Sequence, residues 1–137
     1  MPKVSRVLET CLYVDDVERS AGFYERLFGF KALDRDARFC SLSVNDEAVL
    51  LLFRKGATTR EIATEGGVIP PHDGNGSLHL AFSIAAEEYE PWKRQLENRA
   101  IPIESEVHWT RGGKSLYFRD PDDHLIELVT PGCWSIY

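Results

Sequence analysis

The pattern of apolar and polar residues predicts the same succession of strands and helix in both halves of the chain. In the first half, alternation over residues 7–14 predicts a strand, and a helical period up to about Phe28 predicts an amphipathic helix. Asp15-Asp16 offers a capping carboxylate at the start of that helix, and Gly29 offers the left-handed residue that ends it. Three more strands are predicted at 30–34, 39–44 and 48–54, the last two joined by the turn Asn45-Asp46.

The second half repeats this order. Alternation predicts a strand at 78–84, and a helical period predicts a helix at 87–99 with Pro91 in its first turn, where proline is tolerated. Three strands are predicted at 102–109, 114–119 and 124–130. A repeat of about 65–70 residues indicates two βαβββ modules, about 4–54 and 78–131, within a single α+β domain at 4–131.

The segment between the modules, residues 55–77, breaks both periods. Glycine and proline recur along it, and only a short helical turn around 60–64 is predicted. A loop of this length in a small domain is typical of a lid or of a crossover between subunits, and a plain linker fits equally well.

Composition narrows the class of protein. The 137 residues carry a net charge of −6, which gives no electrostatic footprint for nucleic acid or for an anionic membrane surface. The longest strongly apolar stretch, 48–53, is too short to span a bilayer, and the first residues lack the apolar core of a signal peptide. Three cysteines without metal-finger spacing indicate reduced thiols, so a cytoplasmic location is expected. No nucleotide-binding or serine hydrolase motif is present.

Sorting each predicted strand into its two faces isolates three polar residues. Glu9, His79 and Glu127 all lie on the face that no helix covers, each among small or apolar neighbours. Two carboxylates and an imidazole from three strands are suited to a divalent cation with open coordination positions. The competing interpretation is structural, because an exposed sheet face carries glutamate freely and a lone strand histidine is commonly a core or surface residue.

Longer motifs resemble a known family. LYVDDVERS at 12–20, followed by Phe23-Tyr24 and Leu27-Phe28-Gly29-Phe30, resembles the first module of the vicinal oxygen chelate superfamily. That superfamily includes glyoxalase I, extradiol dioxygenases, bleomycin-binding resistance proteins and fosfomycin-resistance enzymes. HLAF at 79–82, YFRDPD at 117–122 and LIEL at 125–128 resemble its second module. The resemblance spans about residues 4–131 and implies a glyoxalase-like cup, in which paired modules curl a mixed sheet around metal and substrate.

The resemblance implies the same metal ligands, Glu9, His79 and Glu127. The fourth ligand of glyoxalase I-like members falls on Leu51, which cannot ligate, and this argues against a glyoxalase I activity. Extradiol and fosfomycin enzymes use three ligands, usually with histidine rather than glutamate at the first position. A divalent ion is expected, and Mn²⁺, Fe²⁺, Zn²⁺, Ni²⁺ and Mg²⁺ all fit this donor set.

Further site residues follow from an incomplete extradiol-like order. His108, Tyr117 and Glu127 occupy its catalytic positions, although Asp123 stands where that pattern has Gly or Pro. Arg119, Trp109 and Phe53 are expected to bind substrate, and Arg119 is equally able to pair with Glu104 or Glu106.

Two functions follow from this resemblance. The first is a divalent-metal-dependent enzyme of lyase or dioxygenase type that acts on a small oxygen-chelating substrate. The alternative is a metal-free small-molecule binding protein of the bleomycin-resistance kind. In either case the resemblance implies a homodimer.

Overall fold

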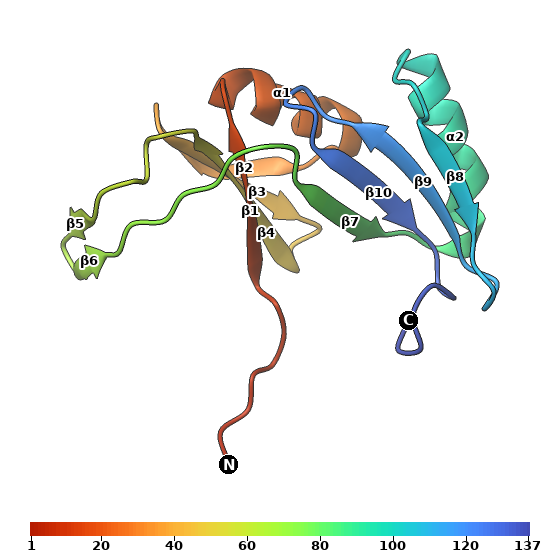
Figure 1. Cartoon of the computed structure of the whole chain (residues 1–137), viewed down its shortest axis with the longest axis horizontal. Coiled ribbons are helices and arrows are strands. Elements are labelled where there is room, and N and C mark those ends of the chain that lie inside the picture. Colours follow the sequence, from red (N-terminus) through yellow and green to blue (C-terminus); the bar gives the residue numbers. More distant parts are fainter. The chain divides into compact units, whose positions relative to one another are not determined.

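A computed structural model describes all 137 residues as two units, Met1–Gly76 and Ser77–Tyr137 (Figure 1). Each unit contains a strand, a helix and three more strands that form one four-stranded mixed sheet, and the first unit adds a two-stranded sheet, β5-β6, after them. The predicted α+β fold with two βαβββ modules is therefore confirmed. Neither helix combines the length and the apolar character needed to cross a membrane.

The first unit packs one helix on one face of its sheet. Its elements are β1 (Glu9–Val14), α1 (Val17–Phe28), β2 (Lys31–Arg35), β3 (Phe39–Val44) and β4 (Ala48–Arg54), with sheet order β1-β4-β3-β2. The Asp16 carboxylate accepts a hydrogen bond from the Arg19 backbone N–H at 3.1 Å, and Gly29 ends the helix at φ 73°. Tyr24 and Leu27 are buried together with Leu42, Leu50 and Leu52, so this face is the core.

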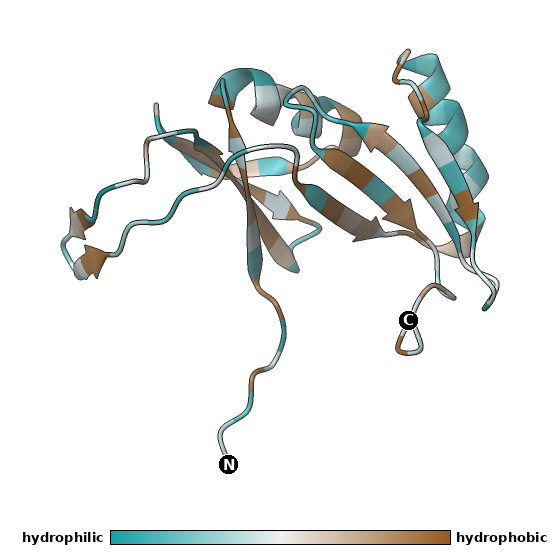
Figure 2. Cartoon of the chain, in the orientation of Figure 1, coloured by the Kyte–Doolittle hydropathy of each residue, from teal (hydrophilic) through white to brown (hydrophobic).

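The second unit is built in the same way. Its elements are β7 (His79–Ser83), a 3₁₀ turn η1 (Ala86–Glu88), α2 (Tyr89–Asn98), β8 (Ser105–His108), β9 (Lys114–Arg119) and β10 (Leu125–Val129), in the order β7-β10-β9-β8. Leu96, Leu116, Phe118, Ile126 and Leu128 form its core. Most of α2 is hydrophilic, whereas β10 is hydrophobic apart from one band, which its sequence LIELV assigns to Glu127 (Figure 2).

The structure of residues 55–77 differs from the prediction. The helical turn expected around 60–64 is wrong, because β5 (Ile62–Thr64) and β6 (Gly67–Ile69) pair as an antiparallel hairpin. Ile62, Val68 and Ile69 are β-branched, and Gly66-Gly67 permits the tight turn, so the local sequence favours strands. The hairpin is absent from the second unit.

Two reciprocal hydrogen bonds join the chain on either side of this hairpin. The His72 backbone N–H donates to the Thr58 carbonyl at 2.9 Å, and the Thr58 hydroxyl donates to the His72 carbonyl at 2.6 Å. The chain then crosses the Tyr13 ring so closely that a Cβ on Gly74 would lie 2.2 Å from two ring carbons. Only glycine fits at that crossing.

Substituting Gly74→Ala is expected to lower the free energy of unfolding by about 1–3 kcal/mol, because the added methyl must displace the buried Tyr13 ring. The matched control is Gly66→Ala, where the nearest atom to the new Cβ is 4.0 Å away. Urea unfolding followed by far-UV circular dichroism measures both variants. Equal stability of the two would show that the crossing is looser than the structure has it.

Candidate metal and substrate site

The uncovered face of the second sheet gathers the polar residues. In the β9–β10 register Glu127 lies opposite Tyr117, and Ser115 lies opposite Val129, so these side chains share one face. The core residues Leu116 and Ile126 occupy the other face, toward α2. Alternation along the strands, read from sequence, thus placed Glu127 and Tyr117 on the correct side.

His79 and Glu127 form a pair at the edge of this face. The His79 Nε2 atom lies 3.2 Å from Glu127 Oε1, and His79 Nδ1 lies 2.9 Å from the carbonyl oxygen of Leu125. A carbonyl can only accept, so Nδ1 carries a proton and donates it. In a neutral ring the lone pair is then on Nε2, directed at an oxygen that is also an acceptor. Two facing acceptors at this distance need a shared cation, either a proton or a metal ion.

The distance suits a metal ion. With bond lengths of about 2.1 Å to nitrogen and oxygen, a ligand separation of 3.2 Å corresponds to an angle of about 100° at the ion. This angle lies between octahedral and tetrahedral values, so the pair requires no rearrangement to act as two adjacent ligands.

A hydrogen-bond relay holds the other oxygen of Glu127. The Ser115 hydroxyl donates to Glu127 Oε2 at 2.5 Å, and the Trp109 indole N–H donates to Ser115 Oγ at 2.8 Å. Ser115 is fully buried and Glu127 is 6% exposed. Partners of this kind fix the orientation of the Glu127 carboxylate, with Oε1 turned toward His79. Trp109, expected to bind substrate, therefore has its N–H engaged in the relay.

Tyr117 supplies a neutral hydroxyl next to the pair. Its ring centroid is 6.3 Å from that of His79. Burial raises the pKa of the Tyr117 phenol, and the Glu127 carboxylate raises it further. The phenol consequently keeps its proton at neutral pH and acts as a hydrogen-bond donor.

Arg119 is held in an ion pair, and His108 lies on the opposite face of the sheet from Glu127. The Arg119 guanidinium pairs with Glu104, with Nε 2.7 Å from Oε2, and it also contacts Ser77. Of the alternatives left open by the sequence, the structure has the ion pair with Glu104. His108 lies opposite Lys114 in the β8–β9 register, and Lys114 lies over the ring of Tyr89 on the α2 side. The register thus puts His108 on the face away from Glu127.

Glu9 belongs to the first unit. It is the exposed first residue of β1, opposite Val49 on β4, and shares its face with Leu51 and Phe53. This is the uncovered face of that sheet, as the alternation predicts. No group of three or more His, Cys, Asp or Glu side chains lies close enough together in the structure to hold a metal ion.

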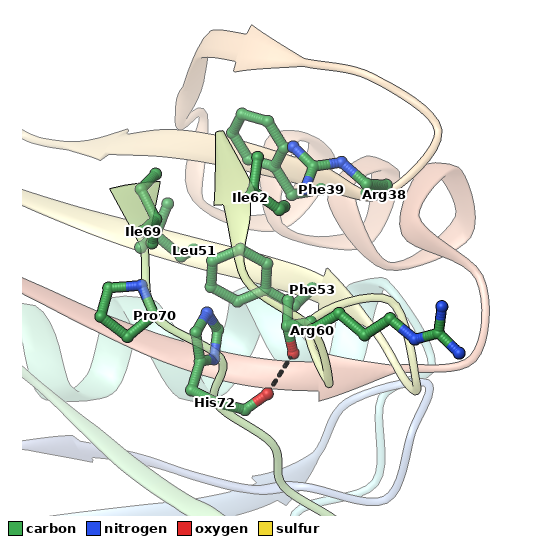
Figure 3. A pocket seen from close by; sticks show the side chains of 10 residues that line it. Arg38, Phe39, Leu51, Phe53, Arg60, Ile62, Ile69, Pro70 and His72 are labelled. Atoms are coloured by element: carbon green, nitrogen blue, oxygen red, sulfur yellow. Dashed lines mark hydrogen bonds between the residues drawn. The ribbon is translucent and has the colours of Figure 1, made fainter. Parts of the chain in front are cut away.

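The same face of the first unit carries a cavity of about 210 Å³ (Figure 3). Phe53, expected to bind substrate, lines it together with residues that the sequence did not predict to contact substrate. Those residues are Arg38, Phe39, Leu51, Thr58, Arg60, Ile62, Ile69, Pro70 and His72. The alternation of β3 and β4 would have revealed Phe39 and Leu51, but the hairpin residues become neighbours only through the fold.

Comparison with known proteins assigns the family. Residues 6–128 match the Glyoxalase/Bleomycin resistance protein/Dioxygenase superfamily. The chain belongs to this superfamily. The metallothiol transferase FosB of Lysinibacillus sphaericus is 29% identical over 119 residues, covering 85% of this chain and 76% of FosB. The glutathione transferase FosA of Serratia marcescens is also 29% identical, covering 85% and 74% of the two chains.

Solved structures agree with this assignment. A lactoylglutathione lyase from Agrobacterium tumefaciens superposes with a TM-score of 0.88 at 29% identity, covering 98% of this chain and 99% of the lyase. The fosfomycin resistance protein FosX from Listeria monocytogenes has the same fold, with a TM-score of 0.68 at 19% identity. The relatives support the interpretation as a metal-dependent superfamily enzyme over that as a metal-free binding protein.

Removing the Ser115 hydroxyl tests the relay. Ser115→Ala leaves a buried carboxylate oxygen and an indole N–H without their partner, so the free energy of unfolding is expected to fall by about 1–3 kcal/mol. The indole N–H resonance of Trp109 should also shift in the NMR spectrum. Ser83→Ala, at an exposed serine on β7 in the same sheet, is the control and should change neither quantity. An unchanged Trp109 resonance in Ser115→Ala would contradict the relay.

Proposed function

We propose that this protein is a divalent-metal-dependent transferase that joins a thiol to a small, oxygen-rich substrate. The observation that carries the proposal is the pair of acceptor atoms, His79 Nε2 and Glu127 Oε1, which face each other at 3.2 Å with every other polar atom of the two groups oriented by a partner. Such pre-orientation is what a metal centre needs, and a simple surface ion pair does not require it.

The proposed ligands are Glu9, His79 and Glu127. Two carboxylates and a neutral imidazole balance the charge of a divalent ion, and three protein ligands leave positions for substrate oxygens. When bound, the ion supplies Lewis-acid polarisation of a substrate oxygen. The mixture of oxygen and imidazole donors fits Mn²⁺, Fe²⁺, Ni²⁺ and Zn²⁺, and fits Mg²⁺ less well because magnesium favours oxygen ligands.

The protein's own groups provide the remaining functions. The protonated Tyr117 hydroxyl is placed to donate a hydrogen bond to a substrate oxygen that gains negative charge. Ser115 and Trp109 keep Glu127 from rotating, so its charge stays directed at the pair site. Arg119, held by Glu104, acts as a structural cation in this scheme.

Thiol transfer is favoured over the other reactions of the superfamily by the relatives. The names metallothiol transferase, glutathione transferase and lactoylglutathione lyase all refer to thiol compounds. The lyase is the second candidate, supported by its TM-score of 0.88. Leu51 argues against it, because the resemblance puts this apolar side chain where glyoxalase I-like members supply a fourth ligand.

We also propose that the working form is a cytoplasmic homodimer. In this superfamily two chains commonly complete one cup, and the three free cysteines are compatible with a reducing compartment. A C₂ dimer would contain two equivalent metal sites.

Metal binding tests the proposed function. The purified protein, stripped and reloaded, is expected to retain about one Mn²⁺, Zn²⁺ or Ni²⁺ per chain by elemental analysis, and to consume fosfomycin with a thiol such as glutathione or cysteine. Glu127→Gln removes one charge from a pre-oriented ligand, so metal affinity should fall at least about 100-fold and turnover should stop.

Glu47→Gln, an exposed glutamate next to β4, is the matched control and should bind metal as the wild type does. Retention of metal by Glu127→Gln would contradict the ligand assignment. Metal binding with turnover of the methylglyoxal–glutathione adduct, and not of fosfomycin, would favour the lyase.

Mixing two inactive variants tests the dimer. Glu9→Gln and His79→Gln proteins, unfolded together and refolded, form half of their dimers as hybrids if chains associate at random. If Glu9 of one chain completes the site of the other, each hybrid has one intact site, and about a quarter of wild-type metal content should return. No recovery would mean that each chain supplies its own three ligands, and a monomeric mass in light scattering would exclude the dimer.

A further inference from the structure

The cavity in the first unit is a formed site that the metal-binding pair does not account for. Its floor is the uncovered face of β3 and β4, where Phe39, Leu51 and Phe53 project, and its other wall comes from the β5–β6 hairpin through Ile62 and Ile69 (Figure 3). A cavity of about 210 Å³ between such walls exceeds the roughly 150 Å³ that is known to hold a benzene ring.

The aromatic residues around this cavity already show the geometry that favours a further ring. The Phe53 and His72 rings lie edge to face, with centroids 4.7 Å apart and planes at 69°. Phe39 and Phe53 are tilted at 33°, with centroids 6.1 Å apart. These separations lie in the range of attractive aromatic pairs, so a planar ring would meet both faces and edges of aromatic side chains.

A polar ring, that of His72, lines this apolar space. The Tyr13 hydroxyl lies 2.7 Å from His72 Nδ1, and burial raises the pKa of Tyr13 to about 12. The phenol is therefore protonated at neutral pH and shares a hydrogen bond with Nδ1 of the His72 ring. Figure 3 shows the tip of the His72 ring directed toward Leu51 and Phe53, away from its backbone.

Two arginines are among the residues that line the cavity. Arg38 is engaged by Asp36 at 3.5 Å and lies over the Phe39 ring. Arg60 lines the cavity, is exposed, and forms no ion pair. Its guanidinium extends away from the cluster of rings (Figure 3). A free guanidinium next to an apolar cavity favours a ligand whose ring is buried and whose anionic group stays at the rim.

We propose that this cavity binds a single aromatic ring that carries a carboxylate or phosphonate, with Arg60 as the partner of the anionic group. The claim that this ligand is part of the substrate rests on the proposed function. Leu51, which lines the cavity, lies opposite Cys11 on β1, and Cys11 is about 7 Å along that strand from Glu9. The cavity would then hold the part of the substrate that does not chelate. As a statement about binding it stands without any metal.

The experiment uses metal-free wild-type protein and benzoate as the probe, followed by ¹H–¹⁵N NMR up to about 10 mM. Benzoate should shift the amides of Thr58 and His72, and acetate should not, because it has no ring to fill the cavity. Benzyl alcohol, which has the ring without the charge, should bind at the same amides.

Three variants separate the ring from the charge. Arg60→Gln should weaken benzoate about tenfold and leave benzyl alcohol within about twofold. Leu51→Phe, which fills the cavity from its floor, should weaken both ligands more than about tenfold while the circular dichroism spectrum stays that of the wild type. Arg94→Gln, an exposed arginine on α2, is the control and should change neither affinity.

Absence of benzoate binding, or shifts confined to amides outside the cavity, would overturn the proposal. Equal effects of Arg60→Gln on benzoate and benzyl alcohol would overturn the role of Arg60. If the protein binds benzoate but retains no metal after loading, the proposed function is refuted and the cavity assignment stands. If it retains metal but does not bind benzoate, the cavity assignment is refuted and the proposed function stands.

Discussion

Glu127 is a carboxylate that the fold removes from water in the middle of a hydrophobic strand. Its neighbours along β10 are Ile126 and Leu128, both fully buried, so the alternation that builds the core also fixes the face on which the carboxylate emerges. A charge that is only 6% exposed must be paired, because an unpaired buried charge costs several kcal/mol. Ser115 satisfies one oxygen and His79 faces the other. The arrangement of the second unit's open face follows from that requirement.

The requirement also explains why the site needs a cation. The carbonyl of Leu125 accepts a hydrogen bond from Nδ1–H of His79, and the hydroxyl of Ser115 donates one to Oε2 of Glu127. The remaining nitrogen and oxygen therefore face each other as acceptors. These two hydrogen bonds therefore determine that His79 Nε2 and Glu127 Oε1 are the atoms left to face each other. Residues 6–128 match the Glyoxalase/Bleomycin resistance protein/Dioxygenase superfamily, and a divalent ion is the cation that we propose for this pair.

Strand alternation carried most of what could be predicted from the sequence. It located β3, β4 and β9 within their observed bounds, and it put Glu127 and Tyr117 on the open face, because period two is a local property of an extended backbone. It failed at 60–64, where a short polar stretch has no clear period and a Gly-Gly turn decides the conformation. The Trp109–Ser115–Glu127 relay and the contact of His72 with Phe53 depend on which strands pair and on where a loop crosses, and no single segment encodes them.

The most direct test is the state of the His79 ring, read from the ¹⁵N chemical shifts of its two nitrogens before and after titration with Zn²⁺. The proposed metal site predicts a proton on Nδ1 in the metal-free protein, held by the Leu125 carbonyl, and a Zn²⁺-dependent shift confined to Nε2 with Nδ1 still protonated. A ring whose Nε2 shift is indifferent to Zn²⁺, with a proton shared permanently with Glu127, would show that the pair is an ion pair and that the protein is not a metal enzyme.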